Sequence, residues 1–270
     1  MNKYILLYIL LFITTVSFSQ NSFHIEFRKD KSVSELGSLL EGKKDGLYAY
    51  FKKEGYFKKI SFYKHGEKLN LSEVNLHDEY YKGNVLKSIG VLKNNKKEGV
   101  WLFFSRNGFI SSASYYQNGI LNGVSYRFHP DGQLSGSDSY VNGRLHGECK
   151  SFHYGGALHV NKKFDMGSIV DGELVYYHAN GTKKMVETRL NGVMVGETKS
   201  YYDTGVIEME GQYDDLGRKV GTWKEYYENG NIKELYNYKN GKFHGEYITY
   251  DLNGKVQEKH VYKNNRRVKN

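Results

Sequence analysis

Three histidines occupy the same place in successive segments of the chain. His129, His153 and His178 are 24 or 25 residues apart, and each stands three residues before a glycine. Imidazole binds zinc, so such a row could be a metal site. If each segment is a β-hairpin, however, equivalent positions lie about 9.6 Å apart, at about 4.8 Å per strand. Zinc holds each ligand nitrogen at about 2.0–2.1 Å, which three residues so spaced cannot satisfy together. We therefore expect no metal site.

The other reactive residue types form no catalytic pattern. Carboxylates occur singly or in doublets such as Asp214-Asp215, and no spacing fixes an acid–base pair. No glycine-rich phosphate loop opens a helix, and no Ser-His-Asp signature has its local context. The one cysteine, Cys149, cannot form an intramolecular disulfide, and we expect it to pack inertly on a strand. The sequence thus predicts a protein that is not an enzyme and has no catalytic residue and no cofactor.

Two turn positions recur nine times with a period of 24 or 25 residues, stretched to 28 or 29 near Leu69 to Asp78. Asn-Gly and Asp-Gly favour two-residue hairpin turns, because both central residues need positive φ. A fixed period of this length indicates a repeat protein. The first turn falls at Gly55, Gly83, Gly108, Gly132, Gly156, Gly181, Gly205, Gly230 and Gly254, and the second at Gly66, Asn95, Gly119, Gly143, Gly167, Gly192, Gly217, Gly241 and Asn265.

Aligning the copies places aromatic residues in two rows and a further glycine nine residues before most first turns. We expect the rows to stabilise neighbouring strands by cross-strand contact and the glycine to mark a bulge. The first row is Phe51, Phe104, Phe128, Phe152, Tyr177, Tyr201, Tyr226 and Tyr250. The second row is Tyr63, Tyr116, Tyr140, Phe164, Tyr213, Tyr238 and Tyr262, with Arg189 as the exception.

These patterns predict an all-β fold: an elongated, single-layer antiparallel β-meander of about nine hairpin repeats. With about 18 strands, its length would be roughly 85 Å. Only one proline, Pro130, occurs in the chain, which fits continuous strands and tight turns. The repeat array is expected over residues 42–270. Residues 21–41 fit no unit and are expected to cap its N-terminal edge.

Residues 1–20 have the composition of a signal peptide. Lys3 precedes an apolar run from Tyr4 to Val16, and Ser17-Phe18-Ser19 matches a signal peptidase site. The run is shorter than the ~20 residues of a membrane span. We expect cleavage before Gln20 or Asn21, export to the periplasm or the extracellular space, and no transmembrane span afterwards. A retained N-terminal anchor is the alternative.

The repeat resembles a known family. The segments Tyr238-Lys239-Asn240-Gly241-Lys242-Phe243-His244-Gly245 and Tyr140-Val141-Asn142-Gly143-Arg144-Leu145-His146-Gly147 are similar to the MORN repeat, and more closely to bacterial MORN-variant proteins of the YwqK-type antitoxin component family. The resemblance runs from about Gly42 to the C-terminus. It implies a single-layer meander used in protein or membrane-surface interaction, with no catalytic residues.

The formal net charge is +9, which favours acidic partners over basic ones. We expect an exported, non-enzymatic binding or scaffold module of the bacterial envelope that recognises a protein or an envelope surface and no nucleic acid. An antitoxin-like or effector-neutralising partner protein is the alternative from a second class, and a carbohydrate-degrading or other hydrolase is a third. The sequence does not fix the oligomeric state.

The candidate binding-face aromatics are Tyr116, Tyr140, Tyr213, Tyr238 and Tyr262, with a basic margin of Lys263, Arg266 and Arg267.

Overall fold

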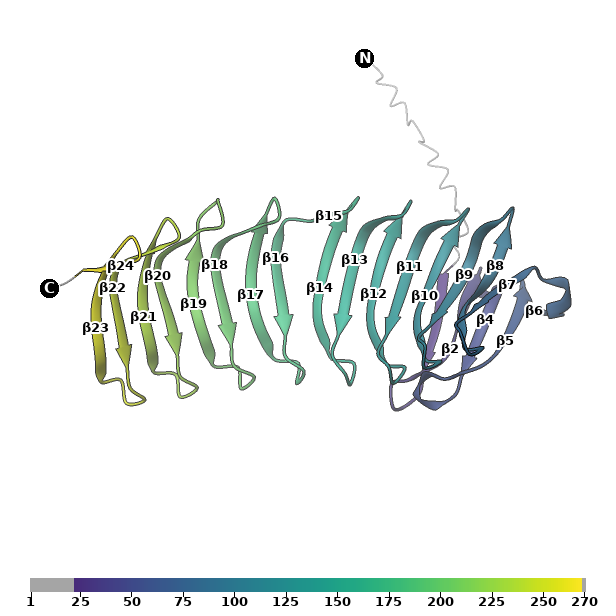
Figure 1. Ribbon diagram of the computed structural model, residues 1–270, viewed down its shortest axis with the longest axis horizontal. Helices are drawn as coiled ribbons and strands as arrows, with labels where there is room; N and C mark the ends of the chain where they lie inside the picture. The colour runs from purple at the N-terminus through teal and green to yellow at the C-terminus, as the bar shows by residue number, and fades with distance from the viewer. Residues whose placement is uncertain (1–21, 269–270) are drawn as a thin grey trace, which may run out of the picture.

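The computed structural model describes residues 22–268, which form two antiparallel sheets joined by tight turns (Figure 1). The predicted signal peptide, residues 1–20, lies outside the described residues. Within them no helix is long and apolar enough to cross a membrane. The smaller sheet contains β1 (Ser22–Phe27), β2 (Val33–Leu40), β3 (Lys43–Lys44), β4 (Gly46–Phe51), β5 (Phe57–Lys64) and β6 (Glu67–Leu69), with the 3-10 turns η1 (Lys53–Gly55) and η2 (Leu71–Glu73) after β4 and β6.

The larger sheet is a meander of eighteen strands in chain order. It is open, because β7 and β24 each pair with one neighbour. The all-β meander is therefore confirmed (Figure 1). Its strands are β7 (Leu76–Tyr80), β8 (Leu86–Lys93), β9 (Lys96–Phe104), β10 (Ile110–Gln117), β11 (Ile120–Phe128), β12 (Leu134–Val141), β13 (Arg144–Phe152), β14 (Leu158–Asp165), β15 (Ser168–Ile169), β16 (Gly172–Tyr177), β17 (Lys183–Leu190), β18 (Val193–Tyr201), β19 (Ile207–Tyr213), β20 (Lys219–Tyr226), β21 (Ile232–Lys239), β22 (Lys242–Tyr250), β23 (Val256–Lys263) and β24 (Arg266–Val268).

The two turns of a repeat differ. At the second turn, Asn240 and Gly241 have φ of 51° and 75°, as a two-residue turn requires. The first turn is longer than predicted: strand β20 ends at Tyr226, β21 begins at Ile232, and the amide of Tyr227 donates to the carbonyl of Asn231 at 2.9 Å. The expectation of a two-residue first turn was wrong, because Gly230 alone adopts positive φ in this loop.

The glycine nine residues before the first turn marks a bulge, as expected. Gly245 has a φ of 109°, and the register of β21 against β22 shifts between Tyr236 and Tyr238. A residue other than glycine would be strained there. The bulge lets one long strand serve both the second turn and the next hairpin.

The N-terminal part of the array has two layers, whereas the prediction had one layer throughout. The smaller sheet packs its apolar side on strands β8 to β11 of the larger sheet, and β2 and β4 lie against β9. Segment 70–75, with η2, joins the two sheets and allows the first repeat to fold back. The common core consists of Val33, Leu36, Leu47, Ala49, Phe51, Ile89, Val100, Leu102, Phe104, Ile110, Ala113 and Phe128.

Residues 21–41, expected to cap the edge of the array, contribute β1 and β2 to the smaller sheet. The strands do not extend the edge strand β7. Instead, a bridge joins Ser32 to Gln133, and the amide of Val33 donates to the carbonyl of Gly132 at 3.0 Å. The segment therefore covers a face of the array, because that face carries the apolar side chains that need burial.

The pairing of β14 with β16, which we call the β14–β16 joint, is weaker than the pairing of the neighbouring strands in the larger sheet. Strands β14 and β16 share one residue pair, Val160 with Tyr176, where strands at other bulges keep two or three beyond the bulge. The spacing from Gly167 to Gly172 is one residue longer than that from Gly241 to Gly245. The extra residue separates β15 from β16 and interrupts the ladder.

Candidate binding face

The larger sheet carries an aromatic face, defined here as the side opposite the smaller sheet. Val100 and Leu102 point into the two-layer core, so Trp101 between them points the other way. Residues two positions after the bulge glycines form its central row, and all but half-buried Tyr247 are buried. The row is Trp101, Ser125, Cys149, Leu174, Thr198, Trp223 and Tyr247. Its residues lie on strands β9, β11, β13, β16, β18, β20 and β22.

Each tryptophan is enclosed by a glycine and a lysine. Trp223 is 0% exposed although it lies in the single-layer region. Its ring covers Gly211 on β19, and the Lys219 ammonium lies 4.0 Å from the ring centroid. Tyr213 and Tyr238 contact it edge-on, with centroid separations of 5.2 and 6.1 Å. A flat aromatic ring over a cross-strand glycine replaces the missing side chain, and the lysine adds a cation–π contact.

The same arrangement recurs twice near the N-terminus. Trp101 covers Gly90, with the Lys97 ammonium 4.6 Å from its ring, and Tyr48 covers Gly37 beneath Lys44. Burial lowers the pKa of Lys97, as it lowers that of Lys219. We call each arrangement of ring, covered glycine and lysine a box, named after its Trp223, Trp101 or Tyr48. The three boxes share the spacing Lys-x-Gly-x-Trp or Lys-x-Gly-x-Tyr. Sequence reasoning missed this signal, because it aligned the glycines without the lysine and tryptophan on either side.

In the last hairpins an aromatic residue takes the place of the lysine. Phe243 stands where Lys219 stands one repeat earlier, opposite Tyr238 just as Lys219 lies opposite Tyr213. It stacks on Tyr238 at 4.6 Å and contacts Tyr262 at 5.7 Å. We call this connected set the C-terminal aromatic cluster: Tyr213, Trp223, Tyr236, Tyr238, Phe243, Tyr247 and Tyr262.

Carboxylates hold several tyrosine hydroxyls of this region. Tyr236 donates to Glu225 at 2.8 Å and Tyr247 donates to Glu234 at 3.0 Å. Burial, and then the hydrogen bond to Glu234, raises the pKa of Tyr247 to about 12. The pKa of Tyr236 is raised in the same way. These phenols are protonated at neutral pH, and their hydrogen bonds to the carboxylates fix the orientation of the rings.

The five predicted binding-face tyrosines are half-buried and do not form one patch. Tyr213, Tyr238 and Tyr262 belong to the C-terminal aromatic cluster. Tyr116 lies far up the chain in the Trp101 box, with Lys97 5.1 Å from its ring. Tyr140 lies between these groups, opposite Gly123 on β11, and takes no part in either cluster among the described ring contacts.

The predicted basic margin lies beside the C-terminal aromatic cluster. Lys263 pairs with Arg266 across the last turn, and Arg267 lies opposite Tyr262. Arg267 thus occupies the position that Lys219 holds opposite Tyr213. All three side chains are exposed, and none forms an ion pair with another residue in the described part of the chain.

The three aligned histidines join neighbouring hairpins. Nε2 of His129, His153 and His178 lies 3.2, 2.8 and 2.7 Å from the carbonyl oxygens of Phe152, Tyr177 and Tyr201, respectively. A carbonyl accepts, so each Nε2 carries the proton. Tyrosine hydroxyls donate in the same way at the equivalent places one and two repeats later, from Tyr202 to Tyr226 and from Tyr227 to Tyr250. The row is a series of structural hydrogen bonds, and no cluster of three metal-ligating residues occurs within residues 22–268.

The structure also explains the exception in the second aromatic row. Arg189 donates from Nε to the carboxylate of Glu187 at 2.8 Å, and Tyr176 donates to the same oxygen at 3.3 Å. Glu187 is 1% exposed and lies opposite Leu174. A buried carboxylate needs such a partner, so the arginine replaces an aromatic ring here. Cys149 is buried as predicted, and burial raises its pKa.

Comparison with protein families identifies four of the repeats. Residues 121–142, 194–215, 219–240 and 243–264 match the family described as the MORN repeat variant. These four segments are similar to MORN-variant repeats. Each spans one hairpin around a first turn, such as β22 and β23 for the last. A search of curated proteins finds no relative that matches this chain.

Solved structures show only slight likeness. A mutant of S. aureus TarM in complex with fondaparinux, alpha-GlcNAc-glycerol and UDP is 10% identical over 36% of this chain and 19% of its own, with a TM-score of 0.25. The TcdB2-TccC3-Cdc42 structure is 9% identical over 91% of this chain and 17% of its own, with a TM-score of 0.16. The Photorhabdus luminescens Tc holotoxin pore is 10% identical over 88% of this chain and 18% of its own, with a TM-score of 0.16. The chain spans less than a fifth of each of these proteins, and TM-scores this low support no inference.

Proposed function

We propose that this repeat protein is an exported binding module of the cell envelope, which docks an acidic protein partner on the C-terminal aromatic cluster and its basic margin. The proposal rests mainly on the combination of a connected aromatic cluster with three exposed cations at one end of the array, which form no ion pair among residues 22–268. Protein interfaces are enriched in tyrosine, tryptophan and arginine. MORN-variant repeats support a binding role, and the signal-peptide composition of residues 1–20 supports export.

The margin and the cluster have different expected roles. Exposed charges act mainly on encounter, and salt screens them within about 8 Å at physiological ionic strength. The rings supply apolar contact area that resists dissociation once the partner has docked. Neutralising the margin should therefore slow association, whereas altering the cluster should speed release.

The variant Phe243→Lys tests the cluster. It restores the lysine that the chain itself uses at Lys97 and Lys219, so the fold should tolerate it. The control Leu145→Lys introduces the same charge at the equivalent place opposite Tyr140. A partner captured from envelope extract by the exported protein should be lost with Phe243→Lys and kept with Leu145→Lys. Equal capture by both variants would contradict this binding face.

Rate measurements with the captured partner test the margin. The triple variant Lys263→Gln, Arg266→Gln and Arg267→Gln should lower the association rate and reduce its dependence on salt, with a smaller change in the dissociation rate. An association rate that does not change with salt concentration would rule out an acidic partner.

Intact mass of the exported protein tests export separately: it should correspond to a chain beginning at Gln20 or Asn21, and a retained Met1 would refute cleavage.

A further inference from the structure

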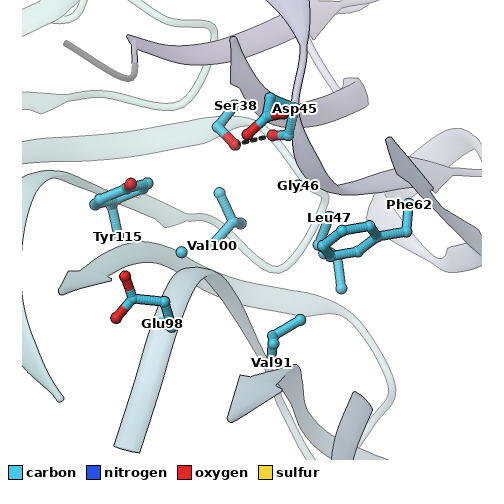
Figure 2. A pocket seen from close by; sticks show the side chains of 10 residues that line it. Ser38, Asp45, Gly46, Leu47, Phe62, Val91, Glu98, Val100 and Tyr115 are labelled. Atoms are coloured by element: carbon cyan, nitrogen blue, oxygen red, sulfur yellow. Dashed lines mark hydrogen bonds between the residues drawn. The ribbon is translucent and has the colours of Figure 1, made fainter. Parts of the chain in front are cut away.

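A cavity of about 200 Å³ lies where the two sheets meet, away from the C-terminal aromatic cluster (Figure 2). Its apolar wall includes Leu47 on β4, Phe62 on β5, and Val91 and Val100 on β8 and β9. Asp45 and Glu98 contribute carboxylates, drawn on opposite sides of the space in Figure 2. At about 30 Å³ per water, the volume corresponds to roughly seven water-sized groups. A small molecule can fit there.

The charge of this cavity is opposite to that of the chain. Among the described residues, two acids line it and no lysine, arginine or histidine does, although the chain has 39 lysines and arginines against 30 acids. Neither Asp45 nor Glu98 forms an ion pair with any residue in the described range 22–268. A partly desolvated carboxylate without a cation favours binding one, because the low dielectric strengthens their attraction.

Each carboxylate also has a structural task that occupies one oxygen. Asp45 Oδ1 accepts from the amide of His65 at 3.0 Å, and Glu98 Oε2 accepts from the amide of Asn118 at 2.8 Å. Asp171 does the same for Asn191 at 2.6 Å in the single-layer region, where no second sheet faces it. Turn capping therefore explains one oxygen of each acid, and the second oxygens of Asp45 and Glu98 remain for a ligand. Asp171 offers a control without a cavity.

From these observations we propose that the cavity between the sheets binds an aliphatic primary amine. The apolar wall contacts the hydrocarbon chain, and Asp45 and Glu98 accept hydrogen bonds from ammonium groups. A free diamine would engage both carboxylates, one at each end. A lysine side chain from another protein would supply the same chemistry with a single ammonium.

Calorimetric titration of the whole protein with 1,4-diaminobutane tests the site, with 1,4-butanediol as the neutral probe of equal length. The diamine should bind and the diol should not. Asp45→Asn and Glu98→Gln keep an oxygen for the turn amide and remove the charge, so each should weaken the diamine by about tenfold or more. Asp171→Asn should leave the affinity unchanged. The variant Val91→Phe, which narrows the cavity and keeps both charges, should also abolish binding.

A capped lysine, Nα-acetyl-lysine methylamide, distinguishes the two sources. If a free diamine is the natural ligand, it should bind more tightly than capped lysine and respond to both carboxylate variants. If a partner's lysine is the source, capped lysine should bind at least as tightly and respond to one variant. Absence of diamine binding, equal binding of the diol, or equal weakening by Asp171→Asn would overturn the proposal.

Discussion

The same repeat is buried differently at the two ends of the molecule. Phe104 and Phe152 occupy the same place in their repeats, at the last residue of β9 and of β13. Phe104 is 2% exposed because the smaller sheet covers it, whereas Phe152 is half-buried. Phe51 and Phe128 are buried like Phe104, whereas the tyrosines of this row from Tyr177 onward are half-buried like Phe152. Burial of a repeat position therefore depends on what packs against that copy, in addition to the repeat itself.

The opposite face behaves in another way. Trp101 in the two-layer region and Trp223 in the single-layer region are 1% and 0% exposed. Each is enclosed by its own glycine and lysine, so its burial does not require a second sheet. The two regions thus differ in burial on the face toward the smaller sheet, and they are equally buried at the tryptophans of the aromatic face. Both halves of this comparison can be tested by substitution.

Truncation of the first aromatic row should show the largest difference. Phe104→Ala removes a ring from the closed core and should cost about 3–5 kcal/mol. Phe152→Ala removes a half-buried ring and should cost about 1–2 kcal/mol. Urea unfolding, together with hydrogen exchange of the strands on either side, measures both, because repeat arrays need not unfold in one step. Equal costs would mean that the smaller sheet contributes nothing to the burial of Phe104.

Alanine at the glycine under each tryptophan should cost the same in both regions. A Cβ on Gly90 would lie 2.3 Å from the Trp101 ring, and one on Gly211 would lie 2.1 Å from the Trp223 ring. Overpacking of this kind costs about 1–3 kcal/mol. In the background Trp223→Ala, adding Gly211→Ala should cost almost nothing, since the ring that it strikes is gone. A clear cost for Gly211→Ala without the ring would show that the glycine serves the backbone instead.

The parts that sequence could predict are those carried by local geometry. Turn residues such as Asn240-Gly241 need positive φ, and Gly245 marks a bulge. The spacing of such residues along the chain therefore predicted the repeat period and the order of the strands. The folding back of the first repeat depends on contacts between segments far apart, such as Val33 with Gly132, which no local pattern contains. The five candidate tyrosines lie on strands, but no local pattern showed that Tyr213, Tyr238 and Tyr262 belong to one cluster, that Tyr116 lies with Lys97, and that Tyr140 joins neither group.

The smallest predicted effect concerns the hydrogen bonds of the histidine row, and it should be unequal along the row. His153 joins the loop before β14 to Tyr177 at the end of β16, so its bond crosses the joint where the ladder has one residue pair. His129 makes the same bond from the loop after β11 to the end of β13, where β12 and β13 keep three residue pairs beyond their bulge. A net hydrogen bond contributes about 0.5–1.5 kcal/mol. His153→Phe should lie near the upper end of that range and His129→Phe near the lower.

Tyrosine at position 153 supplies the control. Tyr202 and Tyr227 already donate from equivalent positions, at 2.7 and 2.9 Å, so His153→Tyr should keep the bond and the stability. Hydrogen exchange of β14 and β16 amides is the measurement, because opening of this joint exposes them first. Faster exchange in His153→Phe and unchanged exchange in His153→Tyr are expected. If both variants exchange equally fast, the imidazole acts at this joint through its packing, and the donor that histidine and tyrosine share is not what holds β14 to β16.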